Sequence, residues 1–254
     1  MLLNADRPVL NDVKIYSNDD KVSSMKSRRT AADNRVTPDA IADAGLELLN
    51  EVGLQGLTMR RIADRLGVAP PALYWHVENK QQLLDAMATV MFRRAMIGLE
   101  APRQDQSFDD WAADWARRLR ASLLRYRDGG KVFAGTAIAD DLMYRTVELF
   151  LRALEDAGFG PRDAARGAHL LLHYTTGFVI EEQASRGLDY SGENPYAADA
   201  ADGLRKKVDP QRYPLMAEVL DDLFVYDPTA SFEHGLLVIL AGLRCLARGQ
   251  SARP

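Results

Sequence analysis

Residues 67–80 read GVAPPALYWHVENK, and this stretch decides how the first part of the chain folds. Its two adjacent prolines suit the first turn of a helix, where the backbone N–H groups have no intrahelical partner. Leu73 and Val77 then share one face of a short helix, expected to run to His76 and to pack inward. The outward face carries Tyr74, Trp75, His76 and, just beyond the helix, Lys80. These aromatic side chains either fill a core or contact something other than the protein.

The residues before this stretch predict two further short helices. Thr37 is a candidate N-cap, and Gly53 is the expected end of the first helix. Its buried face is formed by apolar residues at helical spacing, namely Ile41, Ala44, Leu48 and Leu49. A second helix is expected from Thr58 to Gly67. Two helices joined by a tight glycine-containing turn indicate a helix-turn-helix.

The rest of the chain also shows helical periodicity and no strand-like alternation. Asn79 and Gln82 form a capping signal for a long helix that reaches about Leu99. Later helices are expected over residues 107–128, 140–157, 162–186, 210–223 and 231–248, with a turn-like stretch at 131–139 and a long loop at 187–209. The fold class is therefore all-α. The expected division is a mobile arm (1–36), a helix-turn-helix domain (37–82) and a larger helical domain (83–254).

Composition limits the kinds of function open to the chain. It has 254 residues, a formal net charge of −4 and one cysteine, Cys245, which fits a reducing cytoplasm. No unbroken apolar run approaches the roughly 20 residues that span a bilayer, so no membrane association is expected. Any contact with nucleic acid must use local positive charge. The basic end of the arm either is a solvated tail or touches DNA.

The short helix after the turn is the expected DNA-reading element, because such a helix must be exposed on one face and held by its neighbour. Arg60 and Arg61 lie at the start of the preceding helix, where the DNA backbone or a guanine is within reach. The predicted DNA-contacting residues are Arg60, Arg61, Pro70, Pro71, Ala72, Tyr74, Trp75, His76 and Lys80. The acidic residues of the region lie mostly on the first helix, which predicts moderate salt dependence.

At these residues a family resemblance appears. The segments GLELLNEVGLQGLTMRRIADRLGV and ALYWHVENKQQLLDAM, within residues 37–87, resemble the DNA-binding region of TetR-family transcriptional regulators. RDGGKVFAGT (127–136), EDAGF (155–159) and HYTTGFVIEEQ (173–183) are similar to the ligand-binding core of the tetracycline-responsive members. The resemblance implies a homodimer that binds a palindromic operator as a repressor and is released by a drug-like inducer. Pro70 and Ala72 stand where those members carry glutamine and threonine, so a different operator sequence is expected.

The resemblance also implies a set of ligand-binding positions, and several of them depart from the family pattern. Phe133 replaces a histidine that binds the magnesium carried by tetracycline, and Trp115 and Leu119 replace an asparagine and a phenylalanine. Glu181 is retained, whereas a glutamine corresponds to Leu149 or Phe150. The predicted ligand-binding residues are Trp111, Trp115, Leu119, Phe133, Thr136, Phe150, His173, Phe178 and Glu181. We expect a hydrophobic or aromatic inducer, no cofactor and no metal site.

Several of these residues have a second interpretation. The stripe that contains Trp111 and Trp115 is either core or pocket wall. His169 and His173, four residues apart, suit structural roles better than a metal site, because no third ligand follows at fitting spacing. Glu181 lies on a solvated face or accepts a hydrogen bond in the pocket.

The helices at 162–186 and 231–248 are apolar nearly all round, which predicts burial against a second copy of the chain as a four-helix bundle or full burial within one chain. Two rival functions remain open at this point. One is an all-helical enzyme that uses His173 with Glu181 or Glu182, and the other is an interaction protein that does not bind DNA. An antibiotic efflux or resistance gene is a candidate target of a repressor.

Overall fold

The computed structural model describes residues 36–103, 106–187, 200–224 and 227–251, so the predicted arm lies outside the described residues apart from Val36. In these ranges every regular element is an α-helix, which confirms the predicted fold class. In chain order the helices are α1 (Pro38–Gly56), α2 (Met59–Leu66), α3 (Pro70–Leu73), α4 (Lys80–Met96), α5 (Phe108–Leu124), α6 (Gly129–Ala134), α7 (Asp141–Asp156), α8 (Pro161–Ala184), α9 (Ala200–Arg205), α10 (Pro214–Glu218), α11 (Leu220–Phe224) and α12 (Pro228–Ser251).

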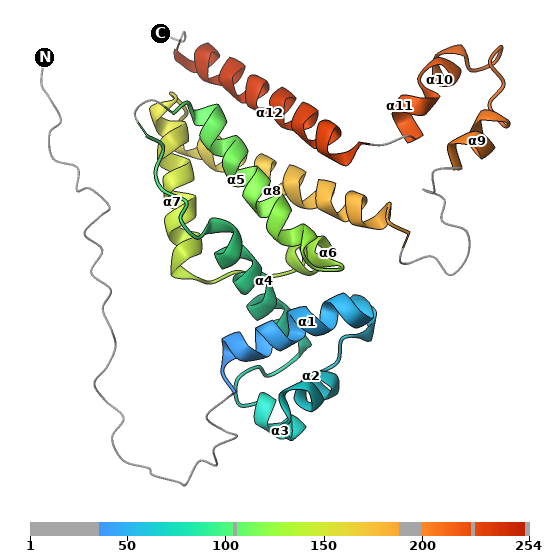
Figure 1. Ribbon diagram of the computed structural model, residues 1–254. Helices are drawn as coiled ribbons and strands as arrows, with labels where there is room; N and C mark the ends of the chain where they lie inside the picture. Colours follow the sequence, from blue (N-terminus) through green and yellow to red (C-terminus); the bar gives the residue numbers. More distant parts are fainter. Residues whose placement is uncertain (1–35, 104–105, 188–199, 225–226, 252–254) are drawn as a thin grey trace, which may run out of the picture.

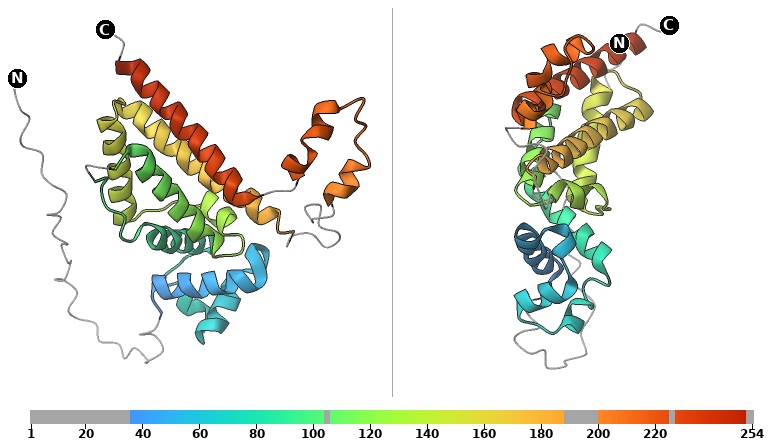
Figure 2. Two further views of the ribbon diagram at one scale, coloured as in Figure 1. Left: turned by 45° about the horizontal axis from the view of Figure 1, so that its top comes forward. Right: turned by 90° about the vertical axis from the view of Figure 1, so that its right-hand side faces the viewer.

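The helices form two groups that α4 connects (Figure 1). At one end, α1, α2 and α3 pack together, and α4 leads from this group into a larger one formed by α5 to α8. The last helix, α12, runs along α8 on the far side of the larger group (Figure 2). Helices α9 to α11 make a small group beside the start of α12. A continuous apolar core links α1 to α8 and the inner face of α12.

Four predicted helix starts are confirmed by their capping hydrogen bonds. The hydroxyl of Thr37 accepts the N–H of Ala40 at 3.1 Å, and that of Thr58 accepts the N–H of Arg61 at 3.3 Å. Helices α4 and α5 begin in the same way at the predicted caps, Asn79 and Ser107. Each cap satisfies an N–H that the first helical turn leaves unpaired.

Two of the early helix ends differ from expectation. Gly53 has φ 67° and ψ 177°, yet the helical segment resumes and reaches Gly56, so this glycine kinks α1 instead of ending it. Helix α3 ends at Leu73, three residues before the predicted end at His76. The N–H of His76 bonds to the carbonyl of Leu73 at 2.9 Å, three residues back, so the last turn tightens and leaves α-geometry.

The Asp128–Gly130 corner was expected to end a helix and open a turn, but it starts helix α6. Asp128 adopts φ 58°, and both following glycines are buried. A Cβ on Gly129 would lie 2.2 Å from the carbonyl oxygen of Leu123. Gly129 is thus needed because α6 approaches the end of α5 closely, a constraint that local sequence does not show.

We predict that Gly129→Ala destabilises the fold by about 2 kcal/mol, because the clash is with backbone, which cannot move aside as a flexible side chain can. Gly135, at the other end of α6, is the matched control, since a Cβ there meets nothing within 4 Å. Chemical denaturation of the two variants checks this. Equal stability of Gly129→Ala and Gly135→Ala would contradict the described corner.

The C-terminal third departs most from the predicted boundaries. A loop was expected at 187–209; residues 188–199 lie outside the described part, and the remainder contains α9. The single helix expected at 210–223 is instead two short helices, α10 and α11. Helix α12 begins at Pro228, before the predicted cap Ser231. Asp227 is the actual cap, because its carboxylate accepts the N–H groups of Thr229 and Ala230 at 2.9 and 3.1 Å.

Helix α12 departs from the expectation that no apolar stretch approaches the length that spans a bilayer. The stretch Pro228–Ala247 is long and apolar enough, by length and composition alone, to cross a membrane. The apolar run is interrupted by Glu233 and Arg244, but these two charges do not offset its many aliphatic residues. Both charges pair with α5: Glu233 with Arg117 at 2.6 Å, and Arg244 with Asp109 at 2.8 Å. One face of α12 is therefore fixed to the folded core.

Candidate functional site

The short α2–turn–α3 segment presents its aromatic residues to solvent. Gly67 ends α2 in the left-handed conformation, with φ 67°, and its N–H bonds back to the last turn of α2. Leu73, Val77 and Ile62 are buried in the core between these helices. The side chain of Trp75, in contrast, is 88% exposed. The alternative that the aromatic residues fill a core is thus wrong for this residue.

The other predicted DNA-contacting residues lie on the same exposed region. Arg60, Arg61, Pro70, Pro71, Tyr74, His76 and Lys80 are exposed, and Ala72 is half-buried.

Three of the cations near this region already make contacts within the protein. Arg61 donates to the carbonyl of Gly56 at 3.0 Å, and Lys80 donates to the carbonyl of Leu54 at 3.2 Å. Arg65 is ion-paired with Glu47 and Glu51 of α1. Arg61 and Lys80 are thus held near the two ends of the α2–α3 unit. Arg65 offsets the negative charge of Glu47 and Glu51 on α1.

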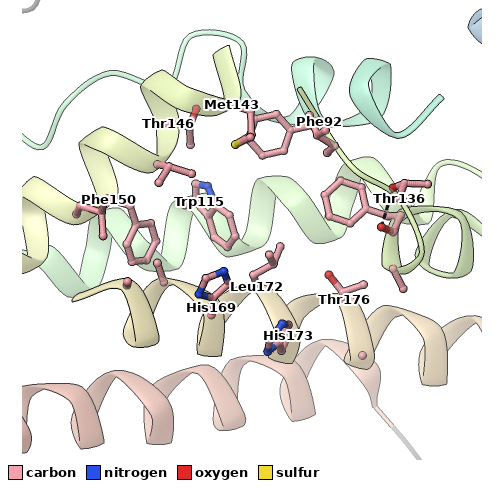
Figure 3. A pocket seen from close by; sticks show the side chains of 18 of the residues that line it. Phe92, Trp115, Thr136, Met143, Thr146, Phe150, His169, Leu172, His173 and Thr176 are labelled. Carbon is pink, nitrogen blue, oxygen red and sulfur yellow. Dashed lines mark hydrogen bonds between the residues drawn. The ribbon is translucent and has the colours of Figure 1, made fainter. Parts of the chain in front are cut away.

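A second candidate site is a cavity of about 520 Å³ in the larger group of helices (Figure 3), a size typical of small-molecule sites. Its walls come from α4, α5, α6, α7, α8 and the segment after α6. The residues that line it are Phe92, Trp115, Phe133, Ala134, Thr136, Ile138, Met143, Thr146, Val147, Phe150, Leu151, Ala165, Ala168, His169, Leu172, His173, Thr176, Gly177 and Ile180.

Five of the predicted ligand-binding residues line this cavity: Trp115, Phe133, Thr136, Phe150 and His173. Trp115 contacts Phe150 edge to face, with 5.5 Å between the ring centroids. The structure thus brings together residues from four different helices and one loop.

Four predicted ligand-binding residues lie outside the lining. Trp111 is buried behind the wall, where its indole N–H donates to the carbonyl of Glu100 at 2.8 Å. Leu119 is in the core, and Phe178 packs edge to face against Phe232 of α12. Glu181 is exposed on α8. Helical rotation explains these positions, since a change of one or two residues along a helix turns a side chain to another face.

Most of the α8 wall was not among the predicted ligand-binding residues. The lining residues of this helix recur at Ala165, His169, Leu172, Thr176 and Ile180, three or four residues apart. This spacing was present in the sequence, but it could not show which face of α8 meets the cavity. His169 and His173 stack on each other at 5.8 Å and are exposed at the cavity, so neither is a core histidine.

Hydrogen bonds connect the helix-turn-helix group to the segments that line the cavity. The N–H of Leu54, at the end of α1, donates to the carboxylate of Asp128 at 2.9 Å. Near the start of α4, Gln81 donates to the carbonyl of Gly135, and Asp85 accepts the N–H of Ala137 at 3.1 Å. Phe133, Ala134 and Thr136 belong to the lining and flank Gly135, so a displacement of this segment is coupled to α4.

The geometry does not support catalysis by His173 with the two glutamates. Glu182 is held by Arg120 in a paired hydrogen bond, at 2.9 and 3.0 Å, and Glu181 points to solvent. Within the described ranges, no group of three histidine, cysteine or carboxylate side chains could hold a metal ion.

Comparisons with known proteins agree with this arrangement. Residues 41–87 match the model of bacterial regulatory proteins of the tetR family, and residues 101–246 match the tetracyclin repressor-like C-terminal domain. The tetracycline repressor protein class A from transposon 1721 of Escherichia coli is 39% identical over 209 residues, which cover 82% of this chain and 91% of that protein.

Solved structures give the same result. A possible TetR family transcriptional regulator from Streptomyces coelicolor A3(2) is 39% identical, with a TM-score of 0.71 over 82% of this chain and 99% of that one. The TetR family protein ActR of Streptomyces coelicolor in complex with actinorhodin is 25% identical, with a TM-score of 0.71 over 82% and 95%. Such proteins are regulators and not enzymes, which removes the enzyme alternative. The chain belongs to the TetR family of transcriptional repressors, with a DNA-binding helix-turn-helix and a ligand-binding domain.

Proposed function

We propose that the protein is a homodimeric repressor that binds a palindromic operator and is released by a hydrophobic, aromatic small molecule. Residues 37–82 form the DNA-binding unit in this proposal, and residues 83–254 form the ligand-binding and dimerisation unit. It acts in the cytoplasm and controls an antibiotic efflux or resistance gene. The names of its relatives support the link to antibiotics.

The observation that carries the DNA-binding part is the exposure of Trp75 beside the buried Leu73 and Val77. An aromatic side chain that is almost fully solvated loses its hydrophobic stabilisation unless a partner covers it. Tyr74 and His76 add groups that hydrogen-bond phosphate oxygens or base edges. The unit therefore has both the shape and the chemistry to enter a DNA groove.

The dimer is supported by an apolar face on α12 that the described part of the chain leaves uncovered. Its exposed apolar side chains are Leu237, Val238 and Leu246, and Leu170 of the adjacent α8 is also exposed. Gly242 lies on the same face with open space around its Cβ position, which allows close approach of a second helix. Exposed apolar patches of this kind are typical of protein interfaces.

A ligand in the cavity acts on DNA binding through α4 in this proposal. The ligand would contact Phe133 and Thr136, which line the cavity. Thr136 lies between Gly135 and Ala137, which are hydrogen-bonded to Gln81 and Asp85 of α4. A ligand shifts the equilibrium only if it binds one conformation more tightly than the other. We infer that the inducer favours a conformation in which the two recognition units are wrongly spaced for the operator.

The test is binding of the purified protein to the DNA that flanks its own gene, measured by fluorescence anisotropy at several salt concentrations. Sequence-specific binding that an aromatic compound reverses is the expected result. The absence of specific binding at every salt concentration would favour the alternative of an interaction protein that does not bind DNA. Reversal only by tetracycline together with magnesium would contradict the aromatic, metal-free inducer.

We predict that Trp75→Ala lowers operator affinity about tenfold, because it removes the largest exposed side chain of the recognition unit. The free energy of unfolding should change by less than about 0.5 kcal/mol, since the side chain makes little contact within the protein. The control is Tyr144→Ala on α7, which removes another exposed aromatic side chain far from α3. Equal DNA affinity of the two variants would remove Trp75 from the interface.

A further inference from the structure

Two histidines on helix α8 lie at the rim of the cavity with ring nitrogens that the fold does not use. His169 and His173 both line the cavity and are both exposed. Within the described part of the chain, neither side chain makes a hydrogen bond or an ion pair, and each ring contacts the other. In Figure 3 the two rings lie one turn apart on α8, across the cavity from Phe92 and Met143.

The spacing of the pair suits a shared metal ion. Side chains four residues apart lie on one face of a helix, and two imidazoles placed in this way bind one ion in helical zinc sites. An ion about 2.0–2.1 Å from one nitrogen of each ring would hold the ring centroids roughly 4.5–6.5 Å apart. The observed separation of 5.8 Å lies in that range. A rotation of the two exposed rings then suffices to point one nitrogen of each at the ion.

Water must complete the ligand shell of such an ion. Among the described residues, no third histidine, cysteine or carboxylate is placed to join the pair. Glu181, eight residues beyond His173 on α8, is about 12 Å away along the helix axis. Two imidazole nitrogens favour Cu²⁺, Ni²⁺ and Zn²⁺, whereas Mg²⁺ and Ca²⁺ prefer oxygen ligands. The chemistry of the pair therefore selects a transition metal.

The surroundings of the pair do not oppose a cation. None of the described lining residues is a lysine or an arginine. Arg166, one turn before His169, is ion-paired with Asp163 at 3.0 Å, which offsets its charge. Leu170 points about 100° away from His169 around the helix, because an α-helix has 3.6 residues per turn. The histidines thus border the cavity, and Leu170 belongs to the face proposed for the dimer.

We propose that His169 and His173 form a transition-metal site that binds one Cu²⁺, Ni²⁺ or Zn²⁺ ion per chain, with water as the remaining ligands. The site goes beyond the proposed repressor function and requires neither operator nor inducer. A bound ion links two successive turns of α8 at the cavity rim. By linkage, an ion and a cavity ligand that contacts this rim alter each other's affinity by the same factor.

The experiment titrates the untagged, chelator-treated full-length protein with Ni²⁺ in a calorimeter, without DNA. We expect one ion per chain, tighter binding of Cu²⁺ than of Ni²⁺, and no binding of Mg²⁺. His169→Gln and His173→Gln should each lower the Ni²⁺ affinity at least about tenfold, because one imidazole remains in place of two. Both side chains are exposed, so these variants are expected to fold.

The matched controls are the other two histidines of the chain, His76 and His234, which lie outside the cavity lining. His76→Gln and His234→Gln should leave the Ni²⁺ affinity unchanged. Electron paramagnetic resonance of the Cu²⁺ complex should show coupling to two nitrogens, and this signal should be lost in His173→Gln.

Several results would overturn the site. They are an unaltered protein that binds neither Ni²⁺ nor Cu²⁺, full Ni²⁺ affinity in both His169→Gln and His173→Gln, or an equal loss in His234→Gln. One ion per two chains would show a site shared between copies and would overturn a site complete within one chain. Operator binding is measured separately, so its failure would contradict the repressor function and leave the metal site unaffected.

Discussion

Leu237→Glu is expected to convert the protein from a dimer to a monomer and to lower operator affinity at least about 100-fold. Leu237 is 61% exposed on the uncovered face of α12, so in the proposed dimer a glutamate there would be buried against apolar side chains of a second copy. A buried, unpaired carboxylate is far more costly than the leucine it replaces. The loss in DNA affinity follows because two linked half-site contacts bind far more tightly than one.

Sedimentation velocity gives the oligomeric state, and fluorescence anisotropy gives the affinity for DNA. The control is Leu215→Glu, which makes the same change at an even more exposed leucine on α10, outside the α8–α12 face. That variant should stay dimeric. A dimeric Leu237→Glu protein with unchanged DNA affinity would show that this face does not form the interface.

Glu182→Ala is expected to lower the free energy of unfolding by about 3 kcal/mol or more. Glu182 and Arg120 form a two-point ion pair between α8 and α5, with side chains only 8% and 15% exposed. The guanidinium of Arg120 also lies over the ring of Phe232, 5.0 Å from its centroid, so α12 is part of the same cluster. Removal of one partner of a buried pair leaves the other charge unpaired in a poorly solvated place.

Thermal or urea denaturation measures the change, and a loss of this size lowers Tm by at least about 6 °C for a domain of this length. Glu181→Ala is the matched control, because the neighbouring glutamate is exposed. It should change stability by less than about 0.5 kcal/mol. If the two alanine variants have equal stability, the Arg120–Glu182 pair does not contribute as described.

These adjacent glutamates also show where sequence reasoning stops. From the sequence, Glu181 was expected on a solvated face or as a hydrogen-bond acceptor in the pocket, and its identical neighbour Glu182 could not be told apart from it by charge. Only the rotation of α8 against α5 places Glu182 beside Arg120 and leaves Glu181 outside. The same rotation removes Phe178 from the cavity and brings His169 into its lining, although His169 was not among the predicted ligand residues.

The recognition unit was the most predictable part of the structure. Its helix starts follow from side chains within four residues of the backbone they cap, as at Thr58 and Asn79. The periodicity of residues 70–77 also determines that Leu73 and Val77 face inward and Trp75 outward. The short extent of α3 was missed, because a shift from four-residue to three-residue hydrogen bonds leaves no clear trace in residue types.

What the sequence by itself determined is the all-helical class, the helix-turn-helix and the side chains that its short helix exposes, since all of these depend on interactions between near neighbours in the chain. The tertiary structure decided which residues line the cavity. It also decided that the indole N–H of Trp111 is hydrogen-bonded to Glu100, and that Gly129 must lack a side chain. Those outcomes depend on the distance and rotation between helices that are remote in sequence. Periodicity shows which residues share a face of a helix, but it does not show which other helix that face contacts.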